Sequence, residues 1–304
     1  MKKKCIALLV IILVFVSSCV QHRNGQSKTA PFNEAQLLEH AKTLSFDMYQ
    51  GRATGSAGGR LAQNYIIKNF KELEVQSFRN YKHDFDVKRN ESTIRGTNIL
   101  GLVNGTTHKD KYIVISAHYD HLGIGKNGQI YNGADDNASG VAALFTFAQY
   151  LKDNPPKHSI ILAAFDAEEI GLQGSKHFVK TIEDKNVLLN INMDMISRSP
   201  KNELYVVGGR YHKPLEEIIE RFENPTSTKL LVGHDGTDGK VDWTLSSDHS
   251  PFHEHGIPFL YFGNEDHSDY HTPSDDFENI TPQFYINAVE IILSILLEID
   301  EKGV

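Results

Sequence analysis

Cysteine is almost absent from this chain of 304 residues, which contains only two. Both lie at the N-terminus, as Cys5 and Cys19, so the rest of the chain carries no thiol. Disulfide bonds and thiolate chemistry are therefore excluded from the main body of the protein. Any metal ion bound there must be held by histidine, aspartate and glutamate side chains.

The chain also lacks an excess of positive charge. Its 31 lysines and arginines face 39 aspartates and glutamates, which gives a formal net charge of −8. Nucleic-acid-binding domains carry a basic surface, so we expect no nucleic-acid partner. The contents of 40% hydrophobic and 23% charged residues are those of an ordinary globular protein that can bury a full core.

The apolar run at the N-terminus, residues 5–16, is too short to span a bilayer as a stable anchor. Three lysines at positions 2–4 precede it, which is typical of a secretory signal peptide over residues 1–18. The end of this segment, Val16-Ser17-Ser18-Cys19, resembles the lipobox of bacterial lipoproteins, whose cysteine becomes the lipidated first residue of the mature protein. An ordinary cleaved signal and an uncleaved membrane helix are the alternatives.

The resemblance to lipoproteins implies a protein of the cell envelope, at its periplasmic or cell-surface face. Membrane contact is then expected only through a lipid on Cys19. Residues 19–31 are polar and lack periodicity, which is typical of a flexible tether. No repeat and no linker interrupts residues 32–304, so these residues are expected to form a single domain.

Three short apolar, β-branched runs predict strands that are buried on both faces: Tyr112–Ala117, Ser159–Phe165 and Val187–Asn192. Helical patterns separate them, and this alternation is typical of an α/β fold with a parallel-centred sheet. Two partly alternating segments, residues 78–87 and 93–103, predict antiparallel strands at a sheet edge. Further helices are expected from Asn33 to about Leu44, after Gly59, after Asp136, near Gly171 and from Thr281 onward, and further strands at residues 204–207, 230–232 and 258–262.

Two adjacent carboxylates, Asp135 and Asp136, stand in a glycine-flanked turn directly before a predicted helix. Crowded acidic side chains repel each other and resist desolvation, so unless solvent screens them they need a cation. In open α/β sheets, ligands bind outside the carboxyl ends of the strands. The predicted topology brings further ligand-type side chains to this edge of the sheet: His118, the Glu168–Glu169 pair, Asp194 and a late loop that contains His271.

The charges of this set fit two zinc ions, which accept imidazole nitrogen and carboxylate oxygen. Three carboxylates, from Asp136, Glu169 and Asp194, offset three of the four positive charges, and a bridging hydroxide offsets the fourth. Glu168 lies next to a ligand but is not needed as one. It is therefore free to take a proton from water.

Other residues compete for these positions. His121 lies close to His118, and Asp135 lies next to Asp136. Glu168 and Glu169 also fit a helix start, where acids favour the N-terminal dipole. Four further histidines precede His271, where the alternative is a histidine-rich surface loop: His249, His253, His255 and His267.

Five segments resemble, in order, the metal-site motifs of the two-zinc aminopeptidases: residues 118–120, 133–140, 165–171, 192–196 and 270–273. This family includes bacterial leucyl aminopeptidase and aminopeptidase S, together with glutaminyl cyclases and glutamate carboxypeptidases. The resemblance extends from about Asn98 to Ile280. It implies a zinc exopeptidase with a three-layer α/β/α sandwich around a mixed, centrally parallel sheet.

The resemblance also implies a ligand set for two zinc ions per chain. His118 and Asp194 match the terminal ligands of one ion. Glu169 and His271 match those of the other. Asp136, the second acid of its pair, matches the residue that bridges the two ions.

The implied activity is that of an aminopeptidase, which hydrolyses the N-terminal bond of a peptide substrate with a free amino terminus. A water molecule that bridges the two metal ions would attack the carbonyl carbon, and Glu168 matches the general base that takes its proton. Asp120 matches an acid that accepts the imidazole N–H of His118 and so fixes its tautomer.

A glutaminyl cyclase, a transferase built on the same scaffold, is the main alternative. Such enzymes usually bind one zinc ion and carry tryptophans around the pocket, including one where this chain has Tyr270. Trp243 is the only tryptophan here. A carboxypeptidase for terminal glutamate would need arginines near the motifs, and none is evident. A non-catalytic metal-binding relative would lack a ligand or the base, whereas this sequence has all of them.

Overall fold

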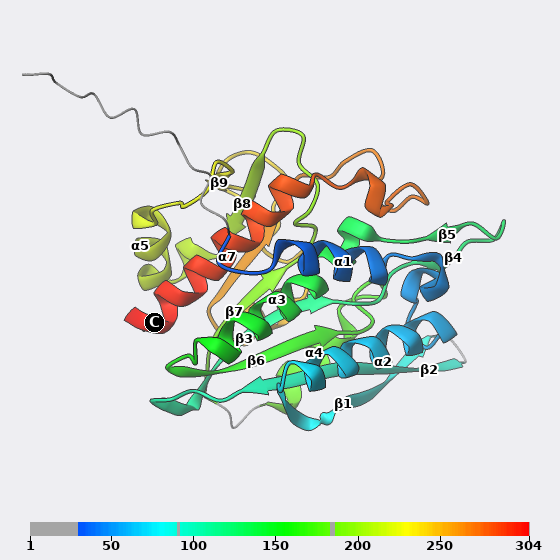
Figure 1. Ribbon diagram of the computed structural model, residues 1–304, viewed down its shortest axis with the longest axis horizontal. Helices are drawn as coiled ribbons and strands as arrows, with labels where there is room; N and C mark the ends of the chain where they lie inside the picture. Colours follow the sequence, from blue (N-terminus) through cyan, green and yellow to red (C-terminus); the bar gives the residue numbers. More distant parts are fainter. Residues whose placement is uncertain (1–29, 90–91, 183–185, 304) are drawn as a thin grey trace, which may run out of the picture.

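An eight-stranded mixed sheet forms the centre of the protein, with the strand order β1-β2-β6-β3-β7-β10-β8-β9 (Figure 1). The computed structural model describes residues 30–89, 92–182 and 186–303. The strands of this sheet are β1 Gln76–Arg89, β2 Ser92–Val103, β3 His108–His118, β6 His158–Phe165, β7 Asn186–Met193, β8 Glu203–Val207, β9 Lys229–Val232 and β10 Phe259–Gly263. A separate small sheet pairs β4 Gly123–Ile124 with β5 Ile130–Tyr131.

The four central strands, β6, β3, β7 and β10, run parallel to one another. At one edge, β1 and β2 form an antiparallel hairpin that joins β6 through β2. Toward the other edge, β8 pairs antiparallel with β10 and parallel with β9. The predicted mixed, centrally parallel sheet is therefore confirmed.

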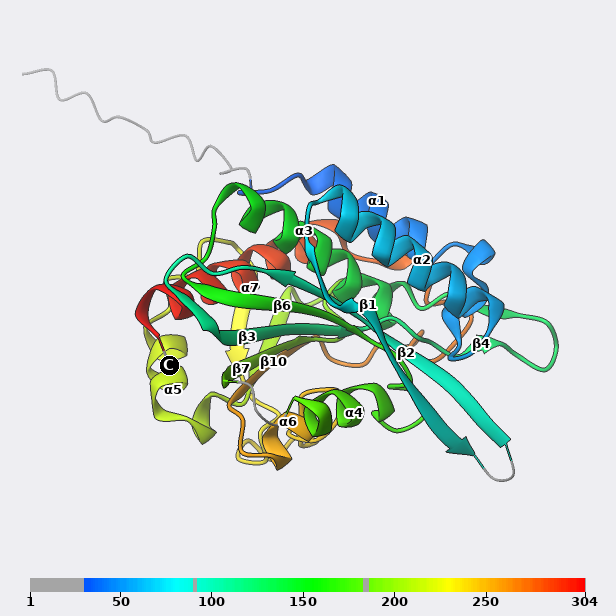
Figure 2. The same cartoon turned by 90° about the horizontal axis from the view of Figure 1, so that it is seen from below.

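Helices cover both faces of the sheet, as Figure 2 shows, with α1, α2, α3 and α7 on one side and α4 and α6 on the other. The remaining helix, α5, contacts α7. The helices are α1 Glu34–Leu44, α2 Ala57–Glu72, α3 Gly140–Asp153, α4 Gln173–Thr181, α5 Lys213–Arg221, α6 Ser250–Glu254 and α7 Pro282–Lys302. The three layers confirm the expected α/β/α sandwich.

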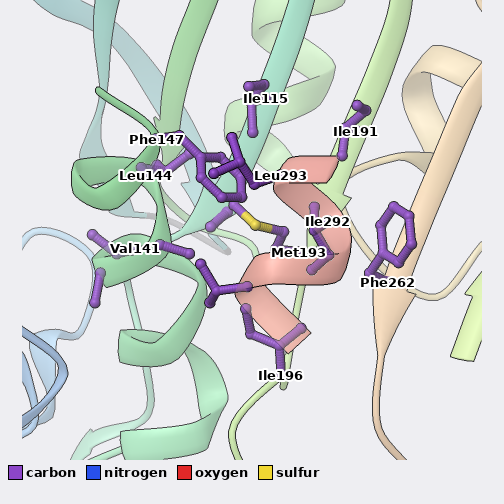
Figure 3. Close-up of a cluster of buried hydrophobic side chains, with 14 of the residues drawn as sticks. Ile115, Val141, Leu144, Phe147, Ile191, Met193, Ile196, Phe262, Ile292 and Leu293 are labelled. Carbon is purple, nitrogen blue, oxygen red and sulfur yellow. The ribbon is translucent and has the colours of Figure 1, made fainter. Parts of the chain in front are cut away.

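The central strands are buried on both faces because alternate side chains enter two different hydrophobic layers. In β3, Ile113 and Ile115 pack into the layer that includes α3 and α7, whereas Val114 packs with Phe178 of α4. Figure 3 shows the first layer, in which side chains of β3, β7, β10, α3 and α7 lie against one another. Burial on both faces explains why the sequence of these strands is continuously apolar rather than alternating.

Helix α7 passes the length and hydropathy test for a membrane span, the one helix among the described residues to do so. However, 67% of its most apolar window is buried inside the protein, so it is a core helix here. It begins after Thr281 as predicted, although the Thr281 side chain makes no capping hydrogen bond. At α1 the predicted cap is present, since the Asn33 side chain accepts a hydrogen bond from the Gln36 N–H at 3.1 Å.

Some elements do not follow from the sequence patterns. The two-residue strands β4 and β5 and the five-residue helix α6 are not predicted, because so few residues carry too little periodicity. Helix α5 is also not predicted, although its nine residues have an apolar face of Leu215, Ile218 and Ile219. The expected signal peptide, residues 1–18, and the lipid site at Cys19 lie outside the described residues, as does most of the tether at 19–31.

The buried histidine His249, which packs against β10, makes the stability of the protein depend on pH. The ring of His249 is fully buried, stacks on Tyr261 and donates from Nε2 to the Trp243 carbonyl at 2.9 Å. Burial lowers the pKa of His249 to about 3, and nearby His253 contributes in the same direction. The folded protein therefore keeps this imidazole neutral, whereas the unfolded chain protonates it below about pH 6.5.

We expect this histidine to contribute a loss of stability as the pH falls from about 7 to 4, by up to about 1.4 kcal/mol per pH unit. The substitution His249→Gln keeps a donor near Nε2 but does not titrate. Denaturant unfolding at several pH values should show that the free energy of unfolding of the variant falls less steeply than that of the wild type. Parallel curves for the two proteins would contradict this linkage.

Candidate metal centre

The chain delivers all the predicted ligand residues to one edge of the sheet. His118 is the last residue of β3, and Asp136 lies in the turn Ala134–Ser139 that leads into α3, with non-helical backbone angles at Asp136 itself. Glu169 follows β6, and Asp194 follows β7 directly. His271 comes from the loop after β10. Because β3, β6, β7 and β10 are parallel, these segments all leave the sheet on the same side.

One group of ligand atoms forms around His118. Its Nε2 atom lies 3.1 Å from Asp194 Oδ1 and 3.3 Å from Asp136 Oδ1. All three residues are buried. Together they form a cluster of three metal-ligand side chains.

A second group forms around the other carboxylate oxygen of Asp136. The Nε2 atom of His271 lies 3.1 Å from Asp136 Oδ2 and 3.3 Å from Glu169 Oε2. The Nδ1 atom of His121 lies 2.7 Å from Glu169 Oε1 and 3.6 Å from Asp136 Oδ2. The second cluster of three metal-ligand side chains consists of His121, Asp136 and Glu169, and it does not include the predicted ligand His271. Asp136 therefore has one oxygen in each group.

The spacing of these donor atoms fits zinc. In a tetrahedral zinc site with bonds of about 2.0–2.2 Å, neighbouring ligand atoms are about 3.4 Å apart. The four separations from His118 and His271 to their carboxylate partners are 3.1–3.3 Å. Although burial opposes ionisation, His121, His118 and His271 hold the pKa of Asp136 well below its usual range. The arrangement thus offers three imidazoles, of His118, His121 and His271, and three carboxylates to two cation positions that share Asp136.

Asp120 orients the site in a different way from the expected one. The Nδ1 atom of His118 lies 3.0 Å from the main-chain oxygen of Asp120 but 3.8 Å from the Oδ1 atom of the Asp120 carboxylate. The carbonyl rather than the carboxylate is thus placed to accept the imidazole N–H and fix the tautomer. The Asp120 carboxylate instead accepts from the main-chain N–H groups of Glu168 at 3.1 Å and Glu169 at 3.3 Å.

Asp135 belongs to neither group of ligand atoms. Its Oδ1 accepts hydrogen bonds from the N–H and hydroxyl of Ser197, at 2.7 and 2.8 Å. Its Oδ2 contacts Asn264 Nδ2 at 3.0 Å and His267 Nε2 at 3.1 Å. These contacts tie the Asp136 turn to the loops that follow β7 and β10, which gives Asp135 and His267 structural roles.

Two residues that hold the site together were not recognised from the sequence. Arg52 is fully buried and donates to three main-chain oxygens of the site loops, those of Tyr119, Asn132 and Gly133, at 2.8, 2.5 and 2.9 Å. Asp275 accepts the main-chain N–H groups of Asp135 and Asp136, each at 3.0 Å. These contacts span from 67 to 140 residues along the chain, so no local pattern reveals them.

Comparison with known families decides where this site belongs. The model of a family described as peptidase family M28 matches residues 98–296. The chain belongs to peptidase family M28. This range agrees with the extent of the five motifs, so the resemblance to the two-zinc aminopeptidase group is confirmed.

Two curated M28-like relatives show how far the similarity extends. Aminopeptidase YwaD of Bacillus subtilis (strain 168) is 32% identical over 219 residues, which are 67% of this chain and 45% of that protein. The alkaline phosphatase isozyme conversion protein of Escherichia coli (strain K12) is 28% identical over 161 residues, which are 48% of this chain and 47% of that protein. The chain therefore spans about half the length of these relatives.

Solved structures share the fold of this M28 chain. BSAP, a zinc aminopeptidase from Bacillus subtilis, has a TM-score of 0.71 at 19% identity, covering 89% of this chain and 96% of that one. The glutaminyl cyclase of Porphyromonas gingivalis also has a TM-score of 0.71, at 17% identity, covering 89% and 99%. At such identities the likeness shows the fold alone, and it fits the peptidase and the cyclase equally well.

The two neighbouring acids give a matched test of the site. Asp136→Asn replaces a carboxylate oxygen in one of the two groups by an amide nitrogen, which cannot ligate zinc, so we expect the number of tightly bound zinc ions to fall below two. Asp135→Asn disturbs only hydrogen bonds, so both ions should be retained while stability falls by about 1–3 kcal/mol. Zinc analysis after dialysis and thermal unfolding measure the two effects. Loss of zinc from Asp135→Asn, with Asp136→Asn unaffected, would show that the assignment is reversed.

Proposed function

We propose that this M28 chain is a zinc-dependent aminopeptidase that hydrolyses the N-terminal peptide bond of oligopeptides. The observation that carries the proposal is the position of Asp136, whose two oxygens lie in two separate groups of ligand atoms. Such a carboxylate suits two metal ions that act on one substrate group. We assign His118 and Asp194 to one ion, Glu169 and His271 to the other, and Asp136 to both.

The ligand atoms open onto a cleft of about 330 Å³. Its walls include Glu168 together with the apolar side chains of Leu172, Met195 and Leu245 and the ring of Tyr270. When bound, two zinc ions supply Lewis acidity toward the scissile carbonyl and lower the pKa of an attacking water. The chain itself supplies the walls that position the peptide and a carboxylate that moves the proton.

Glu168 is the group that we assign to proton transfer. It lies in the cleft, yet the two ligand clusters found in the described part of the chain leave it out. Burial raises the pKa of Glu168 well above its usual range, and Asp194 and Asp248 add to this effect while His118 opposes it. A carboxylate with a raised pKa can take a proton from water near neutral pH and pass it to the leaving amine.

Two features of the cleft favour the peptidase over the other activities known for this fold. Within the described residues no tryptophan lines it, and Tyr270 stacks on His271 where a cyclase would have an indole. Trp243 instead stacks on the ring of His234 at 3.5 Å. No arginine lines the described cleft either, so it lacks the cations that a terminal glutamate would require. The acidic surroundings of the metal positions suit the ammonium group of a free N-terminus.

We further propose that the protein acts at the cell envelope, held by a lipid on Cys19. The sequence Val16-Ser17-Ser18-Cys19 supports this, because it follows a short apolar run and precedes a polar segment. The first described helix begins at Glu34, only fifteen residues after that cysteine. The catalytic domain would then lie close to the membrane surface and act on peptides outside the cytoplasm.

The proposed function is tested with aminoacyl chromogenic substrates, their N-acetylated forms and peptides with an N-terminal glutamine. We expect release from the free aminoacyl substrates, which a chelator abolishes and zinc restores, with little turnover of the acetylated forms. Glu168→Gln should lower kcat by about 10²–10⁴-fold with unchanged zinc content. Glu254→Gln, at an exposed position of α6, is the matched control and should keep full activity.

Two results would overturn this proposal. Cyclisation of the glutamine peptides without aminoacyl release would identify a cyclase. Equal turnover of free and acetylated substrates would show that a free amino terminus is not recognised.

A further inference from the structure

His121 is a buried histidine beside the second group of ligand atoms, and the ligand set assigned above leaves it out. It is 1% exposed, and its Nδ1 atom lies 2.7 Å from Glu169 Oε1. The other oxygen of the same carboxylate, Oε2, lies 3.3 Å from His271 Nε2. Glu169 thus has one oxygen toward His121 and one toward the second metal position.

The surrounding backbone fixes the imidazole of His121 in this place. Gly133, at the start of the Asp136 turn, lies against its ring: a Cβ atom there would be 2.6 Å from His121 Cδ2 and 2.7 Å from Cγ. Gly133 also has a φ of +57°, which glycine adopts without strain. Arg52 binds the carbonyls of both Tyr119 and Gly133, and so connects the segment that carries His121 to the turn beneath it.

The distance to Glu169 distinguishes a hydrogen bond from a shared metal ion. A separation of 2.7 Å is that of a hydrogen bond with a charged acceptor, and it is well below the roughly 3.4 Å between neighbouring ligands of tetrahedral zinc. The Asp136 Oδ2 atom, at 3.6 Å, is beyond hydrogen-bonding distance from the same nitrogen. The Nδ1 atom therefore has one close partner in the site, the Oε1 atom of Glu169.

The second ring nitrogen of His121 does not distinguish between the two tautomers. His121 Nε2 is buried and has no hydrogen-bond partner among the described residues. If Nδ1 were a metal ligand, the ring proton would sit on Nε2, and a buried N–H without an acceptor costs about 1–3 kcal/mol. With the proton on Nδ1, Glu169 satisfies the N–H, and Nε2 is left as a buried acceptor, which costs a similar free energy. The assignment therefore rests on the 2.7 Å contact between Nδ1 and Glu169 Oε1.

We propose that His121 is a positioning residue whose Nδ1–H donates to Glu169 Oε1 and turns Glu169 Oε2 toward the second metal position. The inference rests on the two-metal function proposed above. It assigns a role to the second histidine of the segment His118-Tyr119-Asp120-His121. The two histidines of this segment contact ligand residues of different metal positions, His118 at Asp194 and His121 at Glu169. Loss of an orienting hydrogen bond to a metal ligand lowers affinity by about 10- to 100-fold, so the effect should fall on the second ion.

The test measures zinc binding directly, by calorimetry and chelator competition on the purified protein, and needs no activity assay. His121→Leu removes the donor, whereas His121→Asn places an amide N–H near the position of Nδ1. His158→Leu is the matched control, because His158 Nδ1 pairs with Asp300 Oδ1 at 2.8 Å at the opposite end of β6. Thermal unfolding of each metal-free variant reports whether it folds.

We expect His121→Leu to weaken only the second zinc ion, by about 10- to 100-fold, and His121→Asn to restore most of that affinity. His158→Leu should lose stability but bind both ions like the wild type. Unchanged binding of both ions by folded His121→Leu would overturn the inference. So would an equal loss in His121→Asn, because a hydrogen-bond donor at this position would then not be what holds Glu169. A zinc-bound crystal structure with Nδ1 at about 2.0–2.1 Å from the ion would also overturn it, because His121 would then be a ligand. If the wild type itself binds fewer than two zinc ions, the two-metal assignment fails instead.

Discussion

The carboxylate of Asp136 is the group on which the rest of the site depends, because its two oxygens lie in two different sets of ligand atoms. A carboxylate keeps such a position only if its backbone is fixed. Asp275 accepts the main-chain N–H groups of Asp135 and Asp136, and Arg52 binds the carbonyls of Asn132 and Gly133, directly before the turn. A buried cation and a buried anion from distant segments thus hold one short turn in place.

Several acids are brought together at this sheet edge at an electrostatic cost. Glu168 shows this cost: burial raises its pKa, and the charges of Asp194, Asp248 and Asp120 raise it further, whereas His118 opposes them. In water such carboxylates would separate, but here the parallel strands and the helices on both faces keep them together. Metal ions would convert this repulsion into attraction, and binding energy of this kind also stabilises the folded state. We therefore expect the site to lower the stability of the protein in the absence of metal ions and to raise it when metal ions are bound.

The sequence predicted the parts of the structure that depend on local patterns. The buried strands were recognisable because burial on both faces makes them continuously apolar, as in Ser159–Phe165. The predicted ligand residues come together in space because parallel strands expose their carboxyl ends on one side. The choice of Asp136 over Asp135 as the bridging residue came from a family resemblance, and the geometry that separates the two acids is visible only in the structure.

What the sequence could not predict depends on contacts between distant segments. Arg52 lies in what reads as an ordinary loop, and its partners Asn132 and Gly133 are about 80 residues away. Asp120 was expected to orient His118 through its carboxylate, but whether a carbonyl or a carboxylate faces the ring depends on how the chain turns after β3. The sequence indicates His121 only as an alternative to His118, because its contact with Glu169 requires β3 and β6 to be side by side.

Anomalous diffraction at the zinc absorption edge, from crystals grown with zinc, tests the position of Asp136 most directly. We expect two peaks, one between His118 and Asp194 and the other between Glu169 and His271. A different oxygen of Asp136 should lie about 2.0–2.2 Å from each peak. A single peak, or two peaks with both Asp136 oxygens on the same ion, would contradict the central claim that this carboxylate joins two metal positions.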